Sequence, residues 1–257
     1  MQLIELKKWA YIGIAVIITV VAVVAVGVLL SQNNNNNAEP QQQWVGYANP
    51  ITSDIGGKYN ATLILMARLG DYNSGDIEYT RNNVTIRGYY FSAFEPALQY
   101  LKSSTPENST VLSWWDYGNM IVGYSERNVI ATNPSPSLLK SITNTSANVK
   151  TDSEEKLQDI AKALATTDPQ ETISIMKKYN ARYIYVANGP LGDEGKANWI
   201  LTESGIPTDN LSDYWSDGKL MNKAFNTVIY KILHEQDIPG LQPVFRDANN
   251  RIYRVTD

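Results

Sequence analysis

The spacing of apolar and polar residues changes several times along this chain of 257 residues, and each spacing predicts one kind of element. Alternation on both sides of Arg81-Asn82-Asn83 predicts a β-hairpin over 76–91. Apolar residues three and four apart predict helices, because they share one helix face. The predicted helices cover 93–103, a segment with Leu138, Leu139 and Ile142, 152–166, a segment that starts at Pro169, 193–204 and 220–233. The predicted strands are 109–112, 129–131, 181–187 and, as a terminal hairpin, 243–247 with 251–255.

Helices that alternate with strands are typical of layered α/β domains. The pattern therefore predicts one mixed α/β domain with antiparallel hairpin additions, which begins near Trp44. The Ser31 to Gln43 stretch before it is rich in Asn and Gln and has no core-forming residue, so we expect a polar tether there.

A long apolar stretch precedes this tether. Ala10 to Leu30 has no charged side chain and is long enough to cross a hydrocarbon core of ~30 Å as a helix. Lys7 and Lys8 precede it and the next basic residue is Lys58, so the positive-inside rule predicts a cytoplasmic N-terminus. The alternative is a cleaved signal peptide, whose apolar core is usually ~7–15 residues long. We expect a single-pass protein of the cell membrane with three parts: a cytoplasmic stub and anchor over 1–30, a linker over 31–43 and an extracellular domain over 44–257.

Charge and residue inventory narrow the class of protein. The net charge of −4 argues against a general nucleic-acid-binding face. The absence of cysteine excludes disulfides, thiolate nucleophiles and Cys-ligated zinc. The single histidine, His234, falls near the end of a predicted helix, where a solvated or C-terminal capping role is expected. A Ser-His-Asp arrangement would depend on this one residue.

The most distinctive stretch of the chain is Trp114-Trp115-Asp116-Tyr117-Gly118, which follows a predicted strand. Turns after such strands are common ligand sites in α/β domains. Two indole N–H donors and a carboxylate acceptor match a hydroxyl group, which is one donor and two lone pairs. The alternative interpretation makes the tryptophans core aromatics and Asp116 the cap of the next helix.

A second loop between a strand and a helix, over 188–195, superficially resembles a phosphate-binding turn. It matches neither G-x-G-x-x-G nor the P-loop, and the acidic pair Asp193-Glu194 at the helix start would repel an anion. The alternative, a tight turn with an acidic helix cap, explains the same residues.

The pentapeptide and its flank resemble the catalytic subunit of oligosaccharyltransferase, of the archaeal type. The flank comprises Phe94-Glu95-Pro96-Ala97-Leu98-Gln99-Tyr100-Leu101 and then 105–113. This membrane enzyme transfers glycans to asparagine. The resemblance covers roughly residues 90–255, the soluble C-terminal domain. It implies that the hydroxyl of the Ser or Thr in an Asn-x-Ser/Thr acceptor is held by Trp114, Trp115 and Asp116. Tyr117 and Gly118 complete the motif.

The resemblance also gives meaning to the later helix. Archaeal and eukaryotic family members carry an Asp-x-x-Lys motif beside the pocket, and Asp193 and Lys196 fit it, with Ile200 where the family often has methionine. Residues three apart share a helix face, so both side chains can reach one ligand. The resemblance thus implies an acceptor-binding site of Trp114, Trp115, Asp116, Tyr117, Gly118, Asp193, Lys196 and Ile200.

The family's metal-binding and catalytic carboxylates lie in loops of a multi-span membrane region that has no counterpart here. We therefore expect no catalytic residue, metal site or cofactor in this chain, although the complete family enzyme needs a divalent metal. The resemblance predicts acceptor recognition without transfer, with sequon-bearing polypeptide, the membrane and a polytopic glycosyltransferase subunit as partners and no nucleic acid. The alternative is a tethered structural domain that kept only the fold. The chain's own sequons, which are potential glycosylation sites, are Asn60, Asn83, Asn108, Asn144 and Asn210.

Overall fold

An antiparallel sheet of four strands forms the N-terminal part of the computed structural model, which describes residues 43–143, 150–189, 191–206 and 208–256. The strands lie in the order β1-β2-β3-β4, and we call them the N-terminal sheet. Their bounds are β1 (Trp44–Gly56), β2 (Ala61–Leu69), β3 (Tyr72–Arg81) and β4 (Val84–Phe91). The hairpin predicted over 76–91 is confirmed as β3 and β4, whereas the sequence pattern missed β1 and β2.

The turn of this hairpin follows from its residues. Asn82 and Asn83 both have positive φ, 52° and 60°, and Arg81 pairs with Val84 across the turn. Two central residues of positive φ match the twist of the flanking strands, and asparagine tolerates this conformation better than most residues. The turn therefore fixes the register in which Asp76 lies opposite Tyr89.

A second sheet of five strands, in the order β10-β11-β7-β5-β6, forms the centre of the fold. β5 pairs in parallel with β6 and β7, whereas β11 runs antiparallel to both β7 and β10. The strands are β5 (Thr110–Leu112), β6 (Asn128–Val129), β7 (Ala181–Ala187), β10 (Leu241–Arg246) and β11 (Asn250–Val255). This mixed α/β architecture confirms the predicted fold class of the domain, and the terminal hairpin is confirmed as β10 and β11.

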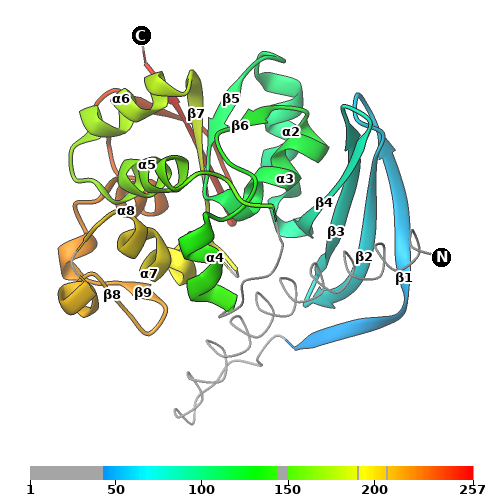
Figure 1. Cartoon of the computed structure of the whole chain (residues 1–257), viewed down its shortest axis with the longest axis horizontal. Coiled ribbons are helices and arrows are strands. Elements are labelled where there is room, and N and C mark those ends of the chain that lie inside the picture. The colour runs from blue at the N-terminus through cyan, green and yellow to red at the C-terminus, as the bar shows by residue number, and fades with distance from the viewer. Residues whose placement is uncertain (1–42, 144–149, 190, 207, 257) are drawn as a thin grey trace.

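Helices flank the central sheet and occupy most of the predicted positions. Figure 1 shows α2 and α3 between the two sheets and the remaining helices on the other side of the central strands. The helices are α2 (Glu95–Ser104), α3 (Gly118–Met120), α4 (Pro136–Thr143), α5 (Glu154–Ala165), α6 (Pro169–Lys178), α7 (Asp193–Glu203) and α8 (Val228–Leu233).

Two helix starts illustrate why these predictions succeeded. The Ser153 side chain accepts a hydrogen bond from the backbone N–H of Lys156 at the start of α5. Asp168 accepts one from Gln170 at the start of α6, where Pro169 occupies the first helical position. Each cap satisfies a backbone donor that the helix itself leaves unpaired.

The single helix predicted over 220–233 is wrong. Lys219–Leu220 forms β9, which pairs with β8 (Trp215–Ser216), and a 3₁₀ turn over Asn222–Ala224 follows. The helix α8 begins only at Val228, because the Thr227 hydroxyl caps it by accepting from the backbone of Tyr230. His234 is exposed and caps the C-terminal end of α8, as predicted.

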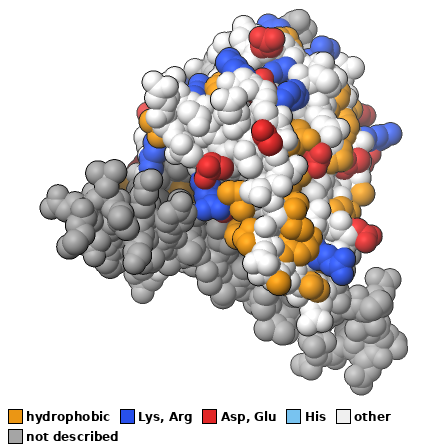
Figure 2. All heavy atoms as spheres, turned by 90° about the vertical axis from the view of Figure 1, so that its right-hand side faces the viewer, with side chains coloured by type: hydrophobic (Ala, Val, Ile, Leu, Met, Phe, Trp, Pro, Cys, Tyr) orange, Lys and Arg blue, Asp and Glu red, His pale blue; other side chains and the backbone are white. Residues whose placement is uncertain are grey.

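Hydrophobic residues remain exposed on the N-terminal sheet. Figure 2, which faces the right-hand side of Figure 1, shows hydrophobic side chains gathered between charged ones. The large exposed hydrophobic residues of this sheet are Val45, Ile51 and Val84. Within the described residues, no helix has the length and apolar character to cross a bilayer. The expected anchor, and the linker as far as residue 42, lie outside the part of the chain that the structure describes.

Candidate functional site

The turn after β5 and the turn after β7 lie at the same edge of the central sheet. β5 and β7 are parallel, so their carboxyl ends meet there. The chain leaves β5 into a 3₁₀ turn, η2 (Trp115–Tyr117), and leaves β7 into the loop that starts α7 at Asp193. The topology therefore brings the pentapeptide and the Asp193/Lys196 helix together, as the family resemblance implied.

Asp116 and Lys196 form the centre of this site. The ammonium nitrogen of Lys196 lies 2.6 Å from Oδ2 of Asp116 and donates to the hydroxyl of Tyr117 at 2.8 Å. The same nitrogen lies 4.1 Å from the centre of the Tyr117 ring. The side chains of Asp116 and Lys196 are only 11% and 13% exposed, so the pair is largely shielded from water. The interpretation of Asp116 as a helix cap is wrong, because neither η2 nor α3 has a side-chain cap.

Asp193 begins α7 and is 1% exposed. Its Oδ2 accepts a hydrogen bond of 2.7 Å from the backbone N–H of Ala187, which ends β7. Burial raises the pKa of Asp193 to about 7; Lys196 opposes this rise, and the charge of Asp116 adds to it. Asp193 thus fixes the start of the helix to the end of the strand, and it exchanges its proton near neutral pH.

Tyr117 connects the site to an aromatic core. Its ring packs edge-on against Phe94 and Tyr185, with centroids 5.4 and 5.3 Å away. Burial, together with the charges of Asp193 and Asp116, raises the pKa of the Tyr117 hydroxyl well above its ordinary value. Tyr117 therefore stays neutral, and it holds the Lys196 ammonium in place through both its hydroxyl and its ring.

The other predicted residues have different surroundings. Trp114 is 2% exposed and packs in the hydrophobic core, so the core interpretation holds for this tryptophan, whereas Trp115 is half-buried. Ile200 is fully buried in α7. Gly118 packs so closely on the segment after β6 that an added Cβ would overlap the carbonyl oxygen of Ala131. Of the eight predicted residues, Asp116, Tyr117, Lys196 and Asp193 are therefore the polar groups that converge.

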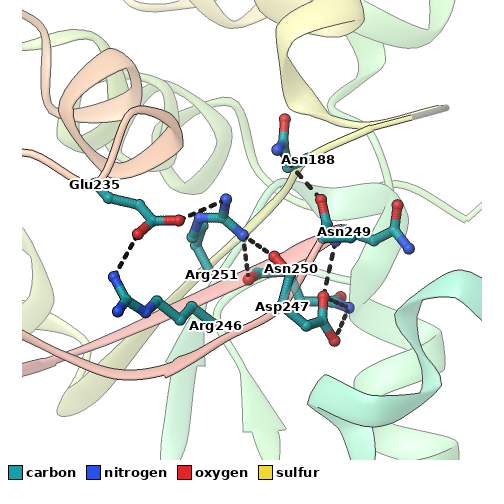
Figure 3. Close-up of polar contacts among 8 residues, drawn as sticks. Asn188, Glu235, Arg246, Asp247, Asn249, Asn250 and Arg251 are labelled. Carbon is teal, nitrogen blue, oxygen red and sulfur yellow. Dashed lines mark hydrogen bonds and ion pairs between the residues drawn. The ribbon is translucent and has the colours of Figure 1, made fainter.

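The turn between β10 and β11 supports the loop that carries α7. The carbonyl of Asn249 accepts a hydrogen bond of 2.7 Å from the backbone of Asn188, as Figure 3 shows. Asn250 is buried, and its side chain donates to the carbonyl of Ala93 at 2.9 Å and accepts from the Tyr185 hydroxyl at 2.9 Å. One asparagine therefore joins β11 to β7 and to the start of α2.

Next to this turn, Arg246 and Arg251 pair with Glu235 at 2.5 and 2.8 Å, as Figure 3 also shows. These ion pairs attach the end of α8 to the hairpin. The role of Asn249 and Asn250 was not predicted, because the asparagines of a turn carry no sequence signal that distinguishes a structural role from solvent exposure.

Several buried polar atoms of the site have no hydrogen-bond partner among the described residues. They include Oδ1 of Asp116, Oδ1 of Asp193, Oγ of Ser113 and the hydroxyl of Tyr89. A buried polar group without a partner is costly, and such groups concentrate at functional sites. Tyr89 was missed as a site residue, because its place in a predicted hairpin gave no indication of which element the strand packs against.

No three His, Asp or Glu side chains come together as a metal-binding group within the described ranges. Of the potential glycosylation sites, Asn60, Asn83, Asn108 and Asn210 have exposed side chains, whereas Asn144 lies outside the described residues. Their modification stays a prediction.

Comparison with known proteins gives the class of protein to which the chain is related. No protein-family model matches the sequence. Curated relatives are glycosyltransferases that act on protein, and the chain matches them over part of its length. It is 27% identical over 117 residues to the dolichyl-diphosphooligosaccharide–protein glycosyltransferase subunit stt3 of Schizosaccharomyces pombe, which is 44% of this chain and 13% of the relative.

Archaeal relatives carry similar names. The chain is 24% identical over 158 residues to dolichyl-phosphooligosaccharide-protein glycotransferase 1 of Archaeoglobus fulgidus, covering 58% of this chain and 23% of the relative. Over 39 residues it is 46% identical to glycotransferase 2 of Pyrococcus horikoshii, 15% of this chain and 5% of the relative. The chain thus spans less than a quarter of each of these relatives. Its relatives are oligosaccharyltransferases of archaeal and eukaryotic origin, which confirms the resemblance that the sequence indicates.

Two solved structures resemble the fold, and both are crystal structures of the C-terminal globular domain of oligosaccharyltransferase from Archaeoglobus fulgidus. One has a TM-score of 0.45 and 19% identity, over 63% of this chain and 96% of that structure. The other has a TM-score of 0.40 and 24% identity, over 64% and 93% respectively.

Proposed function

We propose that the domain recognises the hydroxyl amino acid of Asn-x-Ser/Thr sequences in polypeptide substrates of protein N-glycosylation. One observation carries the proposal: Asp116 of the pentapeptide uses Oδ2 to bind Lys196 and has no partner for its buried Oδ1. The free oxygen is an acceptor for one hydroxyl, and the half-buried Trp115 next to it supplies an indole donor.

Such a pocket distinguishes threonine from alanine because alanine leaves a polar group of the protein without a hydrogen-bond partner. Alanine in place of threonine would leave the buried oxygen of Asp116 without a donor, whereas threonine supplies one, and carboxylate oxygens are among the costliest acceptors to leave unpaired. Sites built to bond a hydroxyl therefore reject analogues that lack it far more strongly than sites that read a methyl group. Lys196 orients Asp116 in the free protein through their ion pair.

Titration of the full chain, in detergent, with two capped peptides tests this proposal. The peptides contain Asn-Ala-Thr and Asn-Ala-Ala and are otherwise identical. We expect the threonine peptide to bind at least about tenfold more tightly, since one charge-assisted hydrogen bond separates the two. Equal affinities, or none for either peptide, would refute the proposal. The variant Asp116→Ala should lose the preference, and the surface variant Asp213→Asn should keep it.

The same proposal includes a membrane anchor over 10–30 with the domain on the extracellular side. The support is the uncharged length of this stretch and the basic residues that precede it. Intact cells treated with an external protease should lose the domain, and carbonate extraction should leave the chain in the membrane fraction. Resistance to the protease in intact cells but not in lysed cells would place the domain inside.

We assign glycan transfer, with the divalent metal that the complete family enzyme needs, to a polytopic partner subunit. A pull-down of the membrane-extracted protein should recover such a subunit. Supplying the purified chain with lipid-linked oligosaccharide, metal and acceptor peptide should give no glycopeptide. Transfer by the purified chain alone would contradict this assignment.

A second candidate function is a tethered structural domain that kept only the fold. The observation that favours it is the core position of Trp114, together with an Asp116–Lys196 pair that also ties η2 to α7. On this alternative, Asp116→Ala lowers stability while the wild-type protein binds neither peptide, so the titration above separates the two functions.

A further inference from the structure

The last residues of the N-terminal sheet lie against the pentapeptide. β4 packs on η2 and α3, and a series of aromatic rings runs from the sheet to the site. Tyr89 stacks on Phe91 with centroids 6.5 Å apart, Phe91 meets Phe94 at 5.3 Å, and Phe94 meets Tyr117 at 5.4 Å. The end of β4 is therefore built into the same aromatic core that holds Tyr117.

The hydroxyl of Tyr89 is buried and has no hydrogen bond of good geometry among the described residues, although the side chain of Ser74 lies beside it. Arg87 lies on the same face of the sheet, but its guanidinium is 2.7 Å from the carboxylate of Asp76 and is thus committed to that group. Burial is the main cause that raises the pKa of Tyr89; the side chain of Ser74 lowers it, and the charge of Asp116 adds to the rise. Tyr89 consequently stays protonated and available as a donor.

The free oxygen of Asp116 is a second buried polar atom next to β4 that has no partner in the described part of the chain. Oδ2 of Asp116 is engaged by Lys196, whereas Oδ1 is a buried acceptor without a partner. An uncommitted donor and an uncommitted acceptor thus lie on neighbouring elements, and they do not bond to each other. A hydroxyl group complements both, because it donates one hydrogen bond and accepts others through the same oxygen.

We infer that Tyr89 is a specificity-determining residue of the acceptor site, which donates a hydrogen bond to the Ser or Thr hydroxyl while that hydroxyl donates to Oδ1 of Asp116. The inference rests on the proposed function and deepens it. Tyr89 lies in the N-terminal sheet, just before the stretch of about 90–255 that resembles the oligosaccharyltransferases. The N-terminal sheet is then part of the acceptor site and not only an attachment to the domain.

The conservative variant Tyr89→Phe tests this role, because it removes the hydroxyl and keeps the ring in the aromatic series. The full chain in detergent is titrated with the Asn-Ala-Thr and Asn-Ala-Ala peptides. We expect Tyr89→Phe to weaken binding of the threonine peptide about three- to tenfold, the effect of one neutral hydrogen bond, and to leave the alanine peptide unchanged. The control is Tyr47→Phe, which removes a hydroxyl from the same sheet that bonds to Asn73 instead. It should bind both peptides as the wild type does.

The outcomes separate this inference from the proposed function. If the wild type prefers the threonine peptide and Tyr89→Phe keeps the full preference, the role of Tyr89 is refuted and the proposed function stands. If the wild type shows no preference, both fail. Should Tyr89→Phe not fold, wild-type protein with ¹³Cζ-labelled tyrosine replaces it. A shift of the Tyr89 signal on addition of the threonine peptide, absent with the alanine peptide, supports the inference, and any other response overturns it.

Discussion

The ammonium nitrogen of Lys196 lies 2.6 Å from the carboxylate of Asp116, although 80 positions of sequence separate the two residues. The contact exists because β5 and β7 are parallel neighbours whose carboxyl ends open at one edge of the sheet. It ties η2 to α7 and fixes the direction in which the second oxygen of Asp116 points. Stability and the proposed recognition of acceptor peptide therefore depend on the same pair.

Breaking this pair from one side should be costly. Lys196→Ala leaves a largely shielded Asp116 carboxylate without its counter-charge, so we expect the free energy of unfolding to fall by about 3 kcal/mol. Urea unfolding followed by circular dichroism measures the change. Lys223→Ala, which removes an exposed ion pair with Asp213, is the control and should have little effect. Equal losses in the two variants would mean that the Asp116–Lys196 pair is no stronger than a surface contact.

Asp193 makes stability depend on pH with a predictable sign. Its pKa is about 7 in the folded protein and ordinarily 3.8, so between these values the folded state holds a proton that the unfolded state has released. The free energy of unfolding should therefore decrease as pH rises from about 4 to about 7 and then level off. Asp76 acts in the same direction. Burial raises its pKa to about 6, although Arg87 opposes the rise, so Asp76 also lowers the free energy of unfolding as pH increases.

Asp193→Asn isolates the first contribution, because the amide oxygen can still accept the hydrogen bond from Ala187. Its free energy of unfolding should fall less than that of the wild type over the same pH range. Chemical unfolding at several pH values between 4 and 8 provides the comparison, with the surface variant Asp213→Asn as control. If the free energy of unfolding of the wild type and of Asp193→Asn changed with pH in the same way, Asp193 would not be the source of the pH dependence.

Two helical glycines should respond to alanine in opposite directions. Gly118 has ordinary helical angles, but an added Cβ would overlap the carbonyl of Ala131 and lie 2.9 Å from Cα of Thr132. Gly118→Ala should therefore destabilise the fold by about 1–3 kcal/mol. Gly195 lies inside α7 with nothing within 4 Å of such a Cβ. Gly195→Ala should raise the free energy of unfolding by about 0.5–1 kcal/mol. Thermal unfolding of both variants tests these expectations, and a stabilising Gly118→Ala would show that the backbone at Ala131 and Thr132 moves to make room.

Asn250 should be among the most sensitive polar positions of the chain. Asn250→Ala removes the partner of both the Ala93 carbonyl and the Tyr185 hydroxyl in the interior, so we expect a loss of about 3 kcal/mol. Asn222→Ala, at an exposed asparagine, should be close to neutral. A small effect of Asn250→Ala in urea unfolding would mean that water replaces the missing side chain.

The elements that the sequence predicted well have strong local signals. The strand over 181–187 is a short apolar run between turn residues, and α5 has both a serine cap and a regular apolar face. The segment over 220–233 shows the limit of such signals. Its apolar spacing fits a helix, but Leu220 pairs with Trp215, and its backbone donates to the side chain of Glu194 on α7. Tertiary contacts that periodicity does not encode decide this segment.

In the candidate site, too, some features could be predicted from the sequence and others depend on tertiary contacts. The resemblance to the oligosaccharyltransferases implied that Asp116 and Lys196 lie in one site, and the parallel pairing of β5 and β7 gives the physical reason. The contribution of the N-terminal sheet was not predictable. β1 is mostly exposed and contains Pro50, and β2 is a nearly continuous apolar run, so neither shows the alternation that indicates a strand. Without these strands, nothing in the sequence indicated that β4, which carries Tyr89, would pack against the turn that carries Asp116.

The position of β11 bears on how the protein is made. This strand, residues 250–255, follows all the other described elements in sequence, yet it lies inside the central sheet between β10 and β7. A ribosome releases residues in order, so β7 has no partner on that side until these residues emerge. Until then, the loop that carries Asp193 and Lys196 lacks the support of Asn249. The proposed acceptor site therefore forms only after residues 250–255 have left the ribosome, and truncated chains that end before β11 should be unable to bind the peptides.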